Sequence, residues 1–250
     1  MYGHAIVRKP GRNFAEGIST SGLGRPDFIK ASLQHEAYRE ALRKSGLDIT
    51  VLEADEHYPD GCFVEDTAVV TDEVAIIANP GASSRQGEEK GIAELLGRYK
   101  TVEKIVFPGT LDGGDILRAG DHFYIGVSAR TNPAGARQLS AILSKYGYSS
   151  SEIIVAEGLH LKSGIASLGN GIFISVPQFA HDVTAANVIL LDQEESYSAN
   201  CLVINGNLLI PAGFPKSRRQ LAGLGYNLLD LDMSEFRKMD GGLTCLSLIF

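Results

Sequence analysis

The chain has 250 residues, 44% of them hydrophobic, and its 23 basic and 30 acidic side chains give a formal net charge of −7. This length can bury a substantial core, whereas the acidic balance argues against a nucleic-acid or anionic-membrane surface, because both need a basic footprint. No apolar run approaches the roughly 18 residues of a membrane span, and the first residues lack the long apolar region of a signal peptide.

Helical and strand patterns alternate along the chain. The predicted helices cover residues 26–44, 84–99, 132–146 and 215–224. The first has Leu33, Ala37 and Ala41 on one face, and the third begins with Asn132 as N-cap and Pro133 at the first helical position. A compact apolar strand follows each helix, at 49–52, 105–107, 153–155 and 228–229. A fifth strand, 188–191, follows a segment without a clear helical pattern.

Hairpin-like stretches lie between these units. Two β-rich runs surround a turn in each of the segments 63–78, 115–127, 165–176 and 201–211. The last apolar run, 243–249, could pair with 4–7 and supply a fifth hairpin. The units recur about every 50 residues, so the sequence predicts an α/β ring of five hairpin–helix–strand units, closed by joining the chain ends. An ordinary α/β sandwich with antiparallel edge strands is the alternative.

Several acidic residues stand out within these patterns. Glu65 and Asp66 lie side by side in an otherwise apolar predicted strand, so at least one carboxylate should face the interior. A buried carboxylate needs a partner, and either a ligand cation or a structural arginine would serve. Asp112 and Asp115 flank two glycines in a segment that fits neither a Ca²⁺ loop nor a phosphate loop, and Asp60 lies in a turn.

A histidine and a cysteine complete the set of candidate reactive groups. His160 alternates with apolar neighbours, which is also typical of a core histidine. Cys245 follows two glycines that allow close backbone approach, as a nucleophile needs, although a buried thiol is the alternative. Cys62 and Cys201 are interpreted as core thiols; the three cysteines have no metal-ligand or disulfide-framework spacing, which favours a reducing cytoplasm. Together these residues are the inventory of cysteine nucleophilic catalysis on a cationic substrate.

Five separated motifs closely resemble dimethylarginine dimethylaminohydrolases. They are the runs 63–67, 110–115, 159–163, 234–238 and 240–245, and the resemblance extends over nearly the whole chain. That family belongs to the guanidino-group-modifying superfamily, whose fold is a five-bladed α/β propeller of ββαβ units, the pentein fold. The resemblance implies one such domain over residues 1–250. It also implies a hydrolase that converts Nω-methylated arginine to citrulline plus dimethylamine or methylamine.

The resemblance also implies catalytic roles. Cys245 matches the nucleophile that attacks the guanidinium carbon. His160 matches the general acid that protonates the departing amine and then the base that activates water. Asp112 matches the acidic partner that orients His160, a position where some relatives carry glutamate.

Substrate-binding roles follow in the same way. The implied residues are Glu65 and Asp66 for the guanidinium, Arg85 and Arg130 for the substrate carboxylate, Asp60 and the carbonyl of Ile18 for the amino-acid end, and the carbonyl of Met239 beside the pocket. The Gly- and Ser-rich segment 17–24 has the composition of a mobile lid or of a plain surface loop.

The expected partner is a small cationic molecule, with neither nucleic acid nor membrane, and a homodimer is left open. No metal or organic cofactor is expected, and zinc on Cys245 and His160 would be adventitious. Two rival functions remain: a small arginine deiminase acting on unmethylated arginine, and a non-catalytic binder of guanidino compounds. An amidinotransferase is less favoured, because the chain carries no segment beyond the minimal ring.

Overall fold

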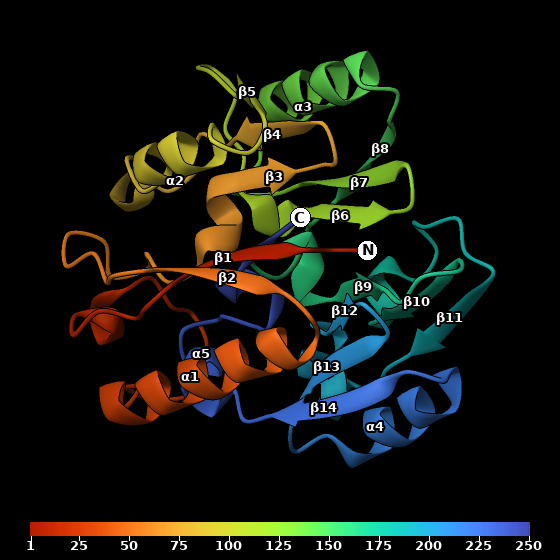
Figure 1. Ribbon diagram of the computed structural model, residues 1–250. Coiled ribbons are helices and arrows are strands. Elements are labelled where there is room, and N and C mark those ends of the chain that lie inside the picture. The colour runs from red at the N-terminus through yellow and green to blue at the C-terminus, as the bar shows by residue number, and fades with distance from the viewer.

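Five separate three-stranded sheets form a ring in the computed structural model, which describes residues 1–250 (Figure 1). The sheets are β15–β1–β2 (Leu248–Ile249, His4–Arg8, Asp48–Leu52), β3–β4–β5 (Ala68–Val70, Val74–Ile77, Thr101–Lys104), β6–β7–β8 (Ile116–Ala119, His122–Val127, Ser149–Ile154), β9–β10–β11 (Ile165–Ser167, Ile172–Ser175, Asn187–Leu190) and β12–β13–β14 (Leu202–Ile204, Asn207–Pro211, Asn227–Leu231). Each middle strand pairs antiparallel with the first strand of its sheet and parallel with the third. This is the ββαβ repeat, so the predicted ring is confirmed and the sandwich alternative is wrong.

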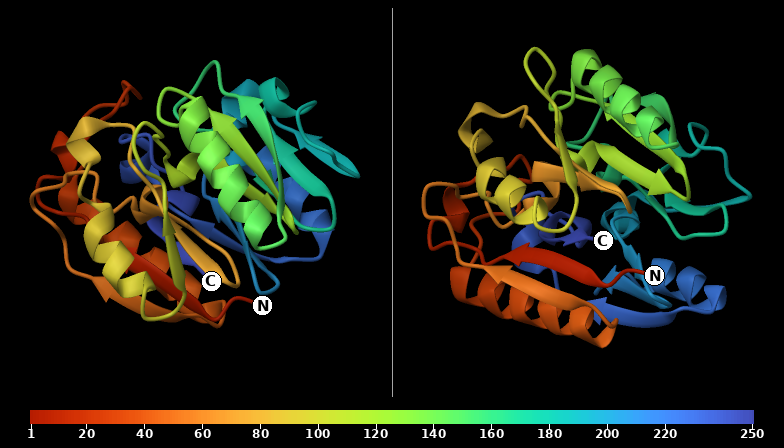
Figure 2. Two further views of the ribbon diagram at one scale, coloured as in Figure 1. Left: turned by 90° about the horizontal axis from the view of Figure 1, so that it is seen from above. Right: turned by 45° about the horizontal axis from the view of Figure 1, so that its top comes forward.

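Four of the five parallel crossovers contain a helix, and these four helices lie at the periphery of the ring (Figures 1 and 2). They are α1 (Phe28–Lys44), α2 (Glu89–Leu96), α3 (Pro133–Lys145) and α4 (Pro215–Leu221), with the short α5 (Ser234–Arg237) near the end of the chain. The N-cap of α3 is Asn132 as predicted, and its side chain accepts a hydrogen bond from the Gly135 N–H at 2.8 Å. Between β10 and β11 there is only the 3₁₀ turn Pro177–Phe179, which explains why no helical pattern was readable there.

The apolar core lies between the sheets and the outer helices. Leu139 and Leu143 of α3 are fully buried in a cluster that also contains Ile76, Phe123 and Ile125 from the neighbouring sheets. None of the helices combines the length and apolar composition required to cross a bilayer.

The two chain ends close the ring. β15 pairs antiparallel with β1, with Ala5 opposite Ile249 and Ile6 opposite Leu248. The His4 N–H donates to the Phe250 carbonyl at 2.8 Å, and the Phe250 N–H donates to the His4 carbonyl at 3.0 Å. Both termini consequently lie side by side in every ribbon view, as the sequence predicted (Figures 1 and 2).

Three local predictions were wrong. The run containing Glu65 and Asp66 is the 3₁₀ turn Val64–Thr67, not a strand, and Cys245 lies in the 3₁₀ turn Thr244–Leu246. The third strand of the second unit is Thr101–Lys104, whereas the predicted 105–107 follows it, with Phe107 89% exposed. The third strands form outer edges of the sheets and are partly solvated, so apolar runs are a poor guide to their position.

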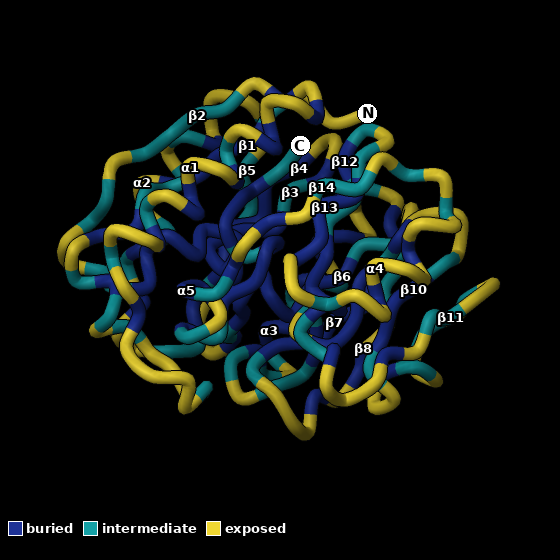
Figure 3. Tube along the Cα trace, turned by 90° about the horizontal axis from the view of Figure 1, so that it is seen from below, coloured by how far each residue is buried: buried dark blue, intermediate teal, exposed yellow.

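A 3₁₀ turn precedes the first strand of every sheet. These five turns, called the inner turns below, are Val64–Thr67, Gly113–Asp115, Leu161–Ser163, Gln193–Ala199 and Thr244–Leu246. They and their flanking residues lie where the five units meet. Buried chain occupies the middle of the molecule and exposed loops occupy its edge (Figure 3).

Candidate active site

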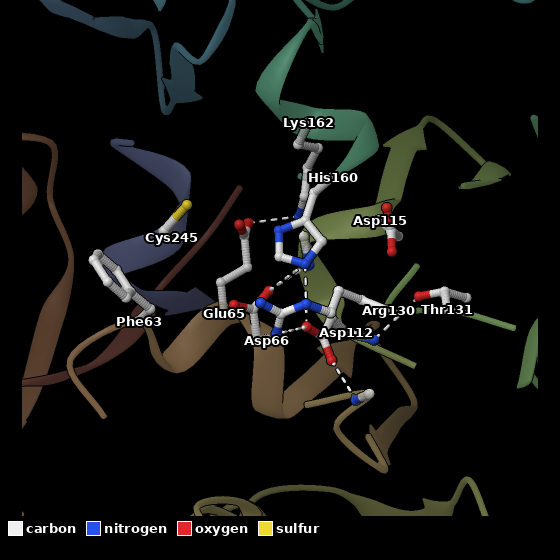
Figure 4. A network of polar contacts seen from close by, with 12 residues as sticks. Phe63, Glu65, Asp66, Asp112, Asp115, Arg130, Thr131, His160, Lys162 and Cys245 are labelled. Carbon is white, nitrogen blue, oxygen red and sulfur yellow. Dashed lines mark hydrogen bonds and ion pairs between the residues drawn. The ribbon is translucent and has the colours of Figure 1, made fainter. Parts of the chain in front are cut away.

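Hydrogen bonds join the inner turns into a closed cycle. The five contacts are Gly114 N–H to Asp66 Oδ1 (2.9 Å), Leu161 N–H to Asp115 Oδ1 (3.0 Å), Asn200 Nδ2 to the Lys162 carbonyl (3.0 Å), Thr244 N–H to Asn200 Oδ1 (3.0 Å) and Thr244 Oγ1 to Glu65 Oε2 (2.8 Å). Equivalent positions of different units therefore converge. Glu65, Lys162 and Cys245, each three residues before the first strand of its sheet, all face the same region (Figure 4).

Glu65 is held by a cation and a hydroxyl. Its Oε1 accepts a hydrogen bond from Lys162 Nζ at 2.5 Å, and its Oε2 accepts the bond from Thr244. Burial raises the pKa of Glu65, and the charge of Lys162 opposes that effect. Both side-chain oxygens of Glu65 are thus occupied as hydrogen-bond acceptors in the middle of the ring.

Asp66 is ion-paired with Arg85. Arg85 Nη1 donates to Asp66 Oδ2 at 2.5 Å, and Arg85 Nη2 donates to Glu88 Oε2 at 2.7 Å. Burial would raise the pKa of Asp66, but the positive charges of His160 and Arg85 hold it at about 2. The structural alternative considered for the adjacent carboxylates is thus realised for Asp66, while Glu65 pairs with lysine rather than with arginine.

His160 contacts Asp112. Its Nε2 lies 3.1 Å from Asp112 Oδ2, and Asp112 is completely buried, with Oδ1 accepting from the Gly81 N–H at 2.9 Å. Burial alone would lower the pKa of His160, but the charge of Asp66, the hydrogen bond to Asp112 and the charge of Asp115 raise it to about 9. The imidazole is therefore protonated at neutral pH.

The two glycines between Asp112 and Asp115 are required by close approach. A Cβ atom at Gly113 would lie 2.0 Å from the Glu65 carbonyl oxygen, and one at Gly114 would lie 2.6 Å from His160 Nδ1. A side chain at Gly113 would push the second inner turn away from the first, and one at Gly114 would push it away from His160. The motif consequently serves to pack backbone against the site rather than to bind phosphate or calcium.

Cys245 lies in the last inner turn and faces the same region as Glu65. Its Sγ accepts a weak hydrogen bond from the Gly242 N–H at 3.4 Å. Burial, followed by the carboxylates of Glu65 and Asp66, raises the pKa of the Cys245 thiol to about 12. The thiol is neutral at physiological pH, and a cation bound against the same carboxylates would favour its ionisation.

Two adjoining cavities bring the sequence-predicted residues together. One, called the inner active-site cavity below, has a volume of about 320 Å³ and is lined by Glu65, Gly114, Lys162, Ser163, Tyr197, Asn200 and Gly242. The other, called the outer cavity below, has a volume of about 350 Å³ and is lined by Ile18, Asp60, Phe63, Asp66, Arg85, Arg130, Leu159, Met239 and Gly241. His160, Asp240 and Cys245 line both. Asp112 alone among the predicted residues lies outside the cavity walls, behind His160.

The outer cavity is bounded by the Gly- and Ser-rich segment. The Ile18 N–H donates to both oxygens of Asp60, at 3.2 and 3.1 Å. The Thr20 N–H donates to Asp240 Oδ2 at 2.5 Å, and Ser19 Oγ donates to the Lys238 carbonyl at 2.7 Å. The segment 17–24 is thus fastened to the 238–240 turn beside the cavity.

Sequence reasoning did not name several residues that shape the site. They are Lys162, Asn200, Asp240 and Thr244 around Cys245, and Glu88 behind Arg85. Lys162, Asp240 and Thr244 lie within recognised motifs, so their positions carried a signal. Asn200 could have been found only by aligning the position before β12 with those before the other first strands.

A larger cavity lies on the other side of the Glu65–Lys162 pair. It occupies about 980 Å³ and is lined by residues of all five first strands, together with Glu65, Lys162 and Thr244. Because Glu65 and Lys162 line this cavity and the inner active-site cavity, their ion pair forms the partition between the two.

The acidic groups around His160 fit an ion-pair network better than a metal centre. Ligand atoms of Asp66, Asp112 and His160 lie within 4.8 Å of one another. Arg85 pairs with Asp66, and Arg130 Nη1 lies 3.6 Å from Asp112 Oδ2. These cations, with the protonated imidazole, oppose the binding of a further positive ion.

Comparison with known proteins identifies close relatives. A sequence-family model described as N,N dimethylarginine dimethylhydrolase, eukaryotic, matches residues 28–203. The chain is 47% identical to an N(G),N(G)-dimethylarginine dimethylaminohydrolase of Pseudomonas aeruginosa, with 100% of each chain covered. A solved structure of a cysteine-to-serine variant of a Pseudomonas aeruginosa enzyme of this type, complexed with citrulline, superimposes with a TM-score of 0.97 at 45% identity over 100% of both chains. A histidine-to-glycine variant of such an enzyme, solved as an adduct with S-methyl-L-thiocitrulline, gives a TM-score of 0.96 at 45% identity, again over 100% of both chains.

Proposed function

The chain belongs to the dimethylarginine dimethylaminohydrolase family, and we propose that Cys245, His160 and Asp112 are the groups with which it hydrolyses Nω-methylated arginine to citrulline and dimethylamine or methylamine. One observation supports this assignment of residues most directly. A thiol, a protonated imidazole and a buried carboxylate, contributed by Cys245, His160 and Glu65, line one small cavity. That combination suits attack on a cationic carbon by sulfur.

Binding is the first task of the site. A guanidinium resists nucleophilic attack because its charge is delocalised, and carboxylates that bond its nitrogens localise the charge and fix its plane. Glu65 and Asp66 supply the negative charge, while Arg85, Arg130 and Asp60 stand in the outer cavity at the amino-acid end. The bound cation also offsets the effect of Glu65 and Asp66 on Cys245, so the thiol loses its proton to solvent when substrate is present.

Attack on the substrate then displaces the amine. The Cys245 thiolate forms a bond to the guanidinium carbon, and the carbon–nitrogen bond to the methylated nitrogen breaks. His160, protonated at neutral pH, donates its proton to that nitrogen, so a neutral amine leaves. The product is a cationic S-alkylthiouronium on Cys245, and Asp112 keeps the imidazole in place throughout.

Water completes the reaction. His160, now neutral, accepts a proton from water as the oxygen bonds to the thiouronium carbon. The carbon–sulfur bond breaks, Cys245 leaves as thiolate and citrulline forms. The second proton released from the attacking water is taken up by the free amine, so atoms and charges balance without any external oxidant or reductant.

Citrulline formation tests this assignment. Purified protein is given asymmetric dimethylarginine, monomethylarginine or unmethylated arginine, and citrulline and amine are quantified. We expect turnover of the methylated substrates and a loss of about 10⁴-fold or more in kcat for Cys245→Ser. Cys201→Ala is the matched control, because Cys201 is a free buried thiol outside the two active-site cavities. Turnover of arginine alone would replace the proposal with a deiminase, and binding without any turnover would replace it with a binding protein.

Further properties of the chain belong to the same proposal. We infer a single α/β propeller domain over residues 1–250, because hydrogen bonds connect all five units through the inner turns and the chain ends pair. Three free cysteines favour a reducing compartment such as the cytoplasm. The net charge of −7 favours a small cationic substrate over nucleic acid or membrane as partner. A homodimer and the absence of a cofactor remain parts of the proposal to be measured.

A further inference from the structure

Asp115 is a buried acidic residue to which the mechanism above assigns neither substrate binding nor proton transfer. It ends the inner turn Gly113–Asp115 and is completely inaccessible to solvent. A Cβ atom at Gly126 would lie 3.0 Å from Asp115 Oδ1, so the carboxylate is also tightly enclosed. Burying a carboxylate is costly unless hydrogen bonds satisfy it, so the partners of Asp115 indicate what it is retained for.

One carboxylate oxygen holds the segment that carries His160. Oδ1 accepts a hydrogen bond from the Leu161 N–H at 3.0 Å. This amide belongs to the peptide bond that directly follows His160, whose own backbone is extended. The bond fixes the plane of that peptide and therefore the direction from which the imidazole reaches Asp112.

The other oxygen holds the segment that carries Arg130. Oδ2 accepts a hydrogen bond from Ser128 Oγ at 2.6 Å. Ser128 Oγ in turn accepts from the N–H groups of Arg130 at 2.9 Å and Thr131 at 3.1 Å. Thr131 Oγ1 accepts from the Asp112 N–H at 3.1 Å, so the same turn also supports the partner of His160 (Figure 4).

We propose that Asp115 is a positioning residue that couples the acid–base group, His160, to the substrate-carboxylate group, Arg130. Its two oxygens connect the segments that carry these two groups through one buried carboxylate. The inference rests on the proposed function, because it takes the roles of His160 and Arg130 from it. Groups of this kind affect activity by about 10- to 100-fold although they do not touch the substrate.

The charge of Asp115 adds a second effect on His160. The charged groups nearest the imidazole are Asp66 from the first inner turn, Asp112 just before the second, Asp115 at its end, and Arg130 beside Asp112. Glu65, Lys162, Asp240 and the Cys245 thiol line the same cavity as His160. Removal of one negative charge lowers the pKa of His160 below its present value of about 9. The fraction of protonated general acid then begins to fall at a lower pH.

Asp115 makes two connections, called arms below: Oδ1 accepts from the Leu161 N–H, and Oδ2 accepts from Ser128 Oγ. Two variants distinguish the effects of these arms. Asp115→Asn removes the charge and disturbs both arms, whereas Ser128→Ala removes only the arm to Arg130 and leaves the Leu161 bond and the charge. For Asp115→Asn we expect kcat/KM to fall about 10- to 100-fold and the alkaline limb of its pH profile to move to lower pH. For Ser128→Ala we expect a several-fold rise in KM with an unchanged alkaline limb.

A measurement on the imidazole keeps this inference distinct from the proposed function. The pKa of His160 is followed by NMR in the wild type and both variants, with the folded fraction of each checked by thermal melting. A His160 pKa that falls in Asp115→Asn but not in Ser128→Ala supports the effect of Asp115 on His160 even if no citrulline is ever formed, in which case the proposed function alone fails. Equal His160 pKa values and equal KM in all three folded proteins would overturn it. If Asp115→Asn does not fold, an unchanged KM in Ser128→Ala overturns the coupling by itself.

Discussion

The inner turns and the outer layer around α3 belong to the same repeats, yet they are built in opposite ways. The buried face of α3 is apolar, with Leu139, Ile142 and Leu143 packed into the core. The inner turns contain buried and partly buried residues but carry charges, among them Glu65, Asp115 and Lys162 on successive units. Apolar burial stabilises the outer layer directly, whereas the inner turns need every polar group paired merely to offset the cost of burial.

The difference indicates that the outer layer mainly stabilises the fold and that the inner turns mainly position the reactive groups. The hydrogen-bonded cycle of inner turns fixes the positions of the reactive groups, but replacing a buried charge pair does not by itself make a protein less stable. The outer layer provides the free energy of folding that the inner turns lack. Substitutions in the two regions should therefore affect different measurements.

The largest expected effect on stability lies in the outer layer. Leu139→Ala removes a fully buried side chain from α3 and leaves a cavity, so we expect the free energy of unfolding to fall by about 2–5 kcal/mol. Urea denaturation measures the loss. The kcat of the folded fraction at low temperature should equal that of the wild type. A large loss of kcat without loss of stability would contradict the separation of the two regions.

The next prediction compares the ion pair between Lys162 and Glu65 with one on the outer surface, and its expected effect is of intermediate size. Lys162→Met leaves Glu65 buried without its cation, which raises the pKa of that carboxyl further and weakens binding of a cationic substrate. We expect KM to rise by about tenfold, with a loss of stability of about 1–3 kcal/mol.

The matched control for that variant is Lys145→Met. Lys145 pairs with Glu103 at 3.4 Å on the outer surface, where a salt bridge contributes about 0–1 kcal/mol. KM and stability should both remain close to wild type. If the two lysine variants behave alike in both assays, the inner pair has no special role.

The last expected effect is a pH dependence of stability. The pKa of His160 is raised from 6.5 to about 9 in the folded protein, so its contribution is fully present below about pH 6.5 and is lost as the pH rises through about 9. Melting temperatures of the wild type and His160→Gln, measured from pH 6 to 10, should converge toward the alkaline end. A constant difference across this range would show that the imidazole gains nothing from its carboxylate neighbours.

Local sequence patterns determined much of this protein. The repeating units and the capped helix after Asn132 were readable, because hairpins, helix caps and apolar alternation depend on neighbouring residues. The motifs around Asp112, His160 and Cys245 also indicated which residues would carry chemistry. The roles assigned to them stay predictions until the variants above are measured.

Only the tertiary structure decided which polar groups meet. The pairing of Lys162 with Glu65 and the bond from Asn200 to Thr244 join different units, so no local pattern specifies them. The 3₁₀ conformation at Glu65 was mistaken for a strand because its apolar neighbours suit either structure. Ring closure buries the five inner turns against one another, so the charges there need partners from elsewhere in the fold: Glu65 pairs with Lys162 on another inner turn, and Asp66 pairs with Arg85 outside the inner turns.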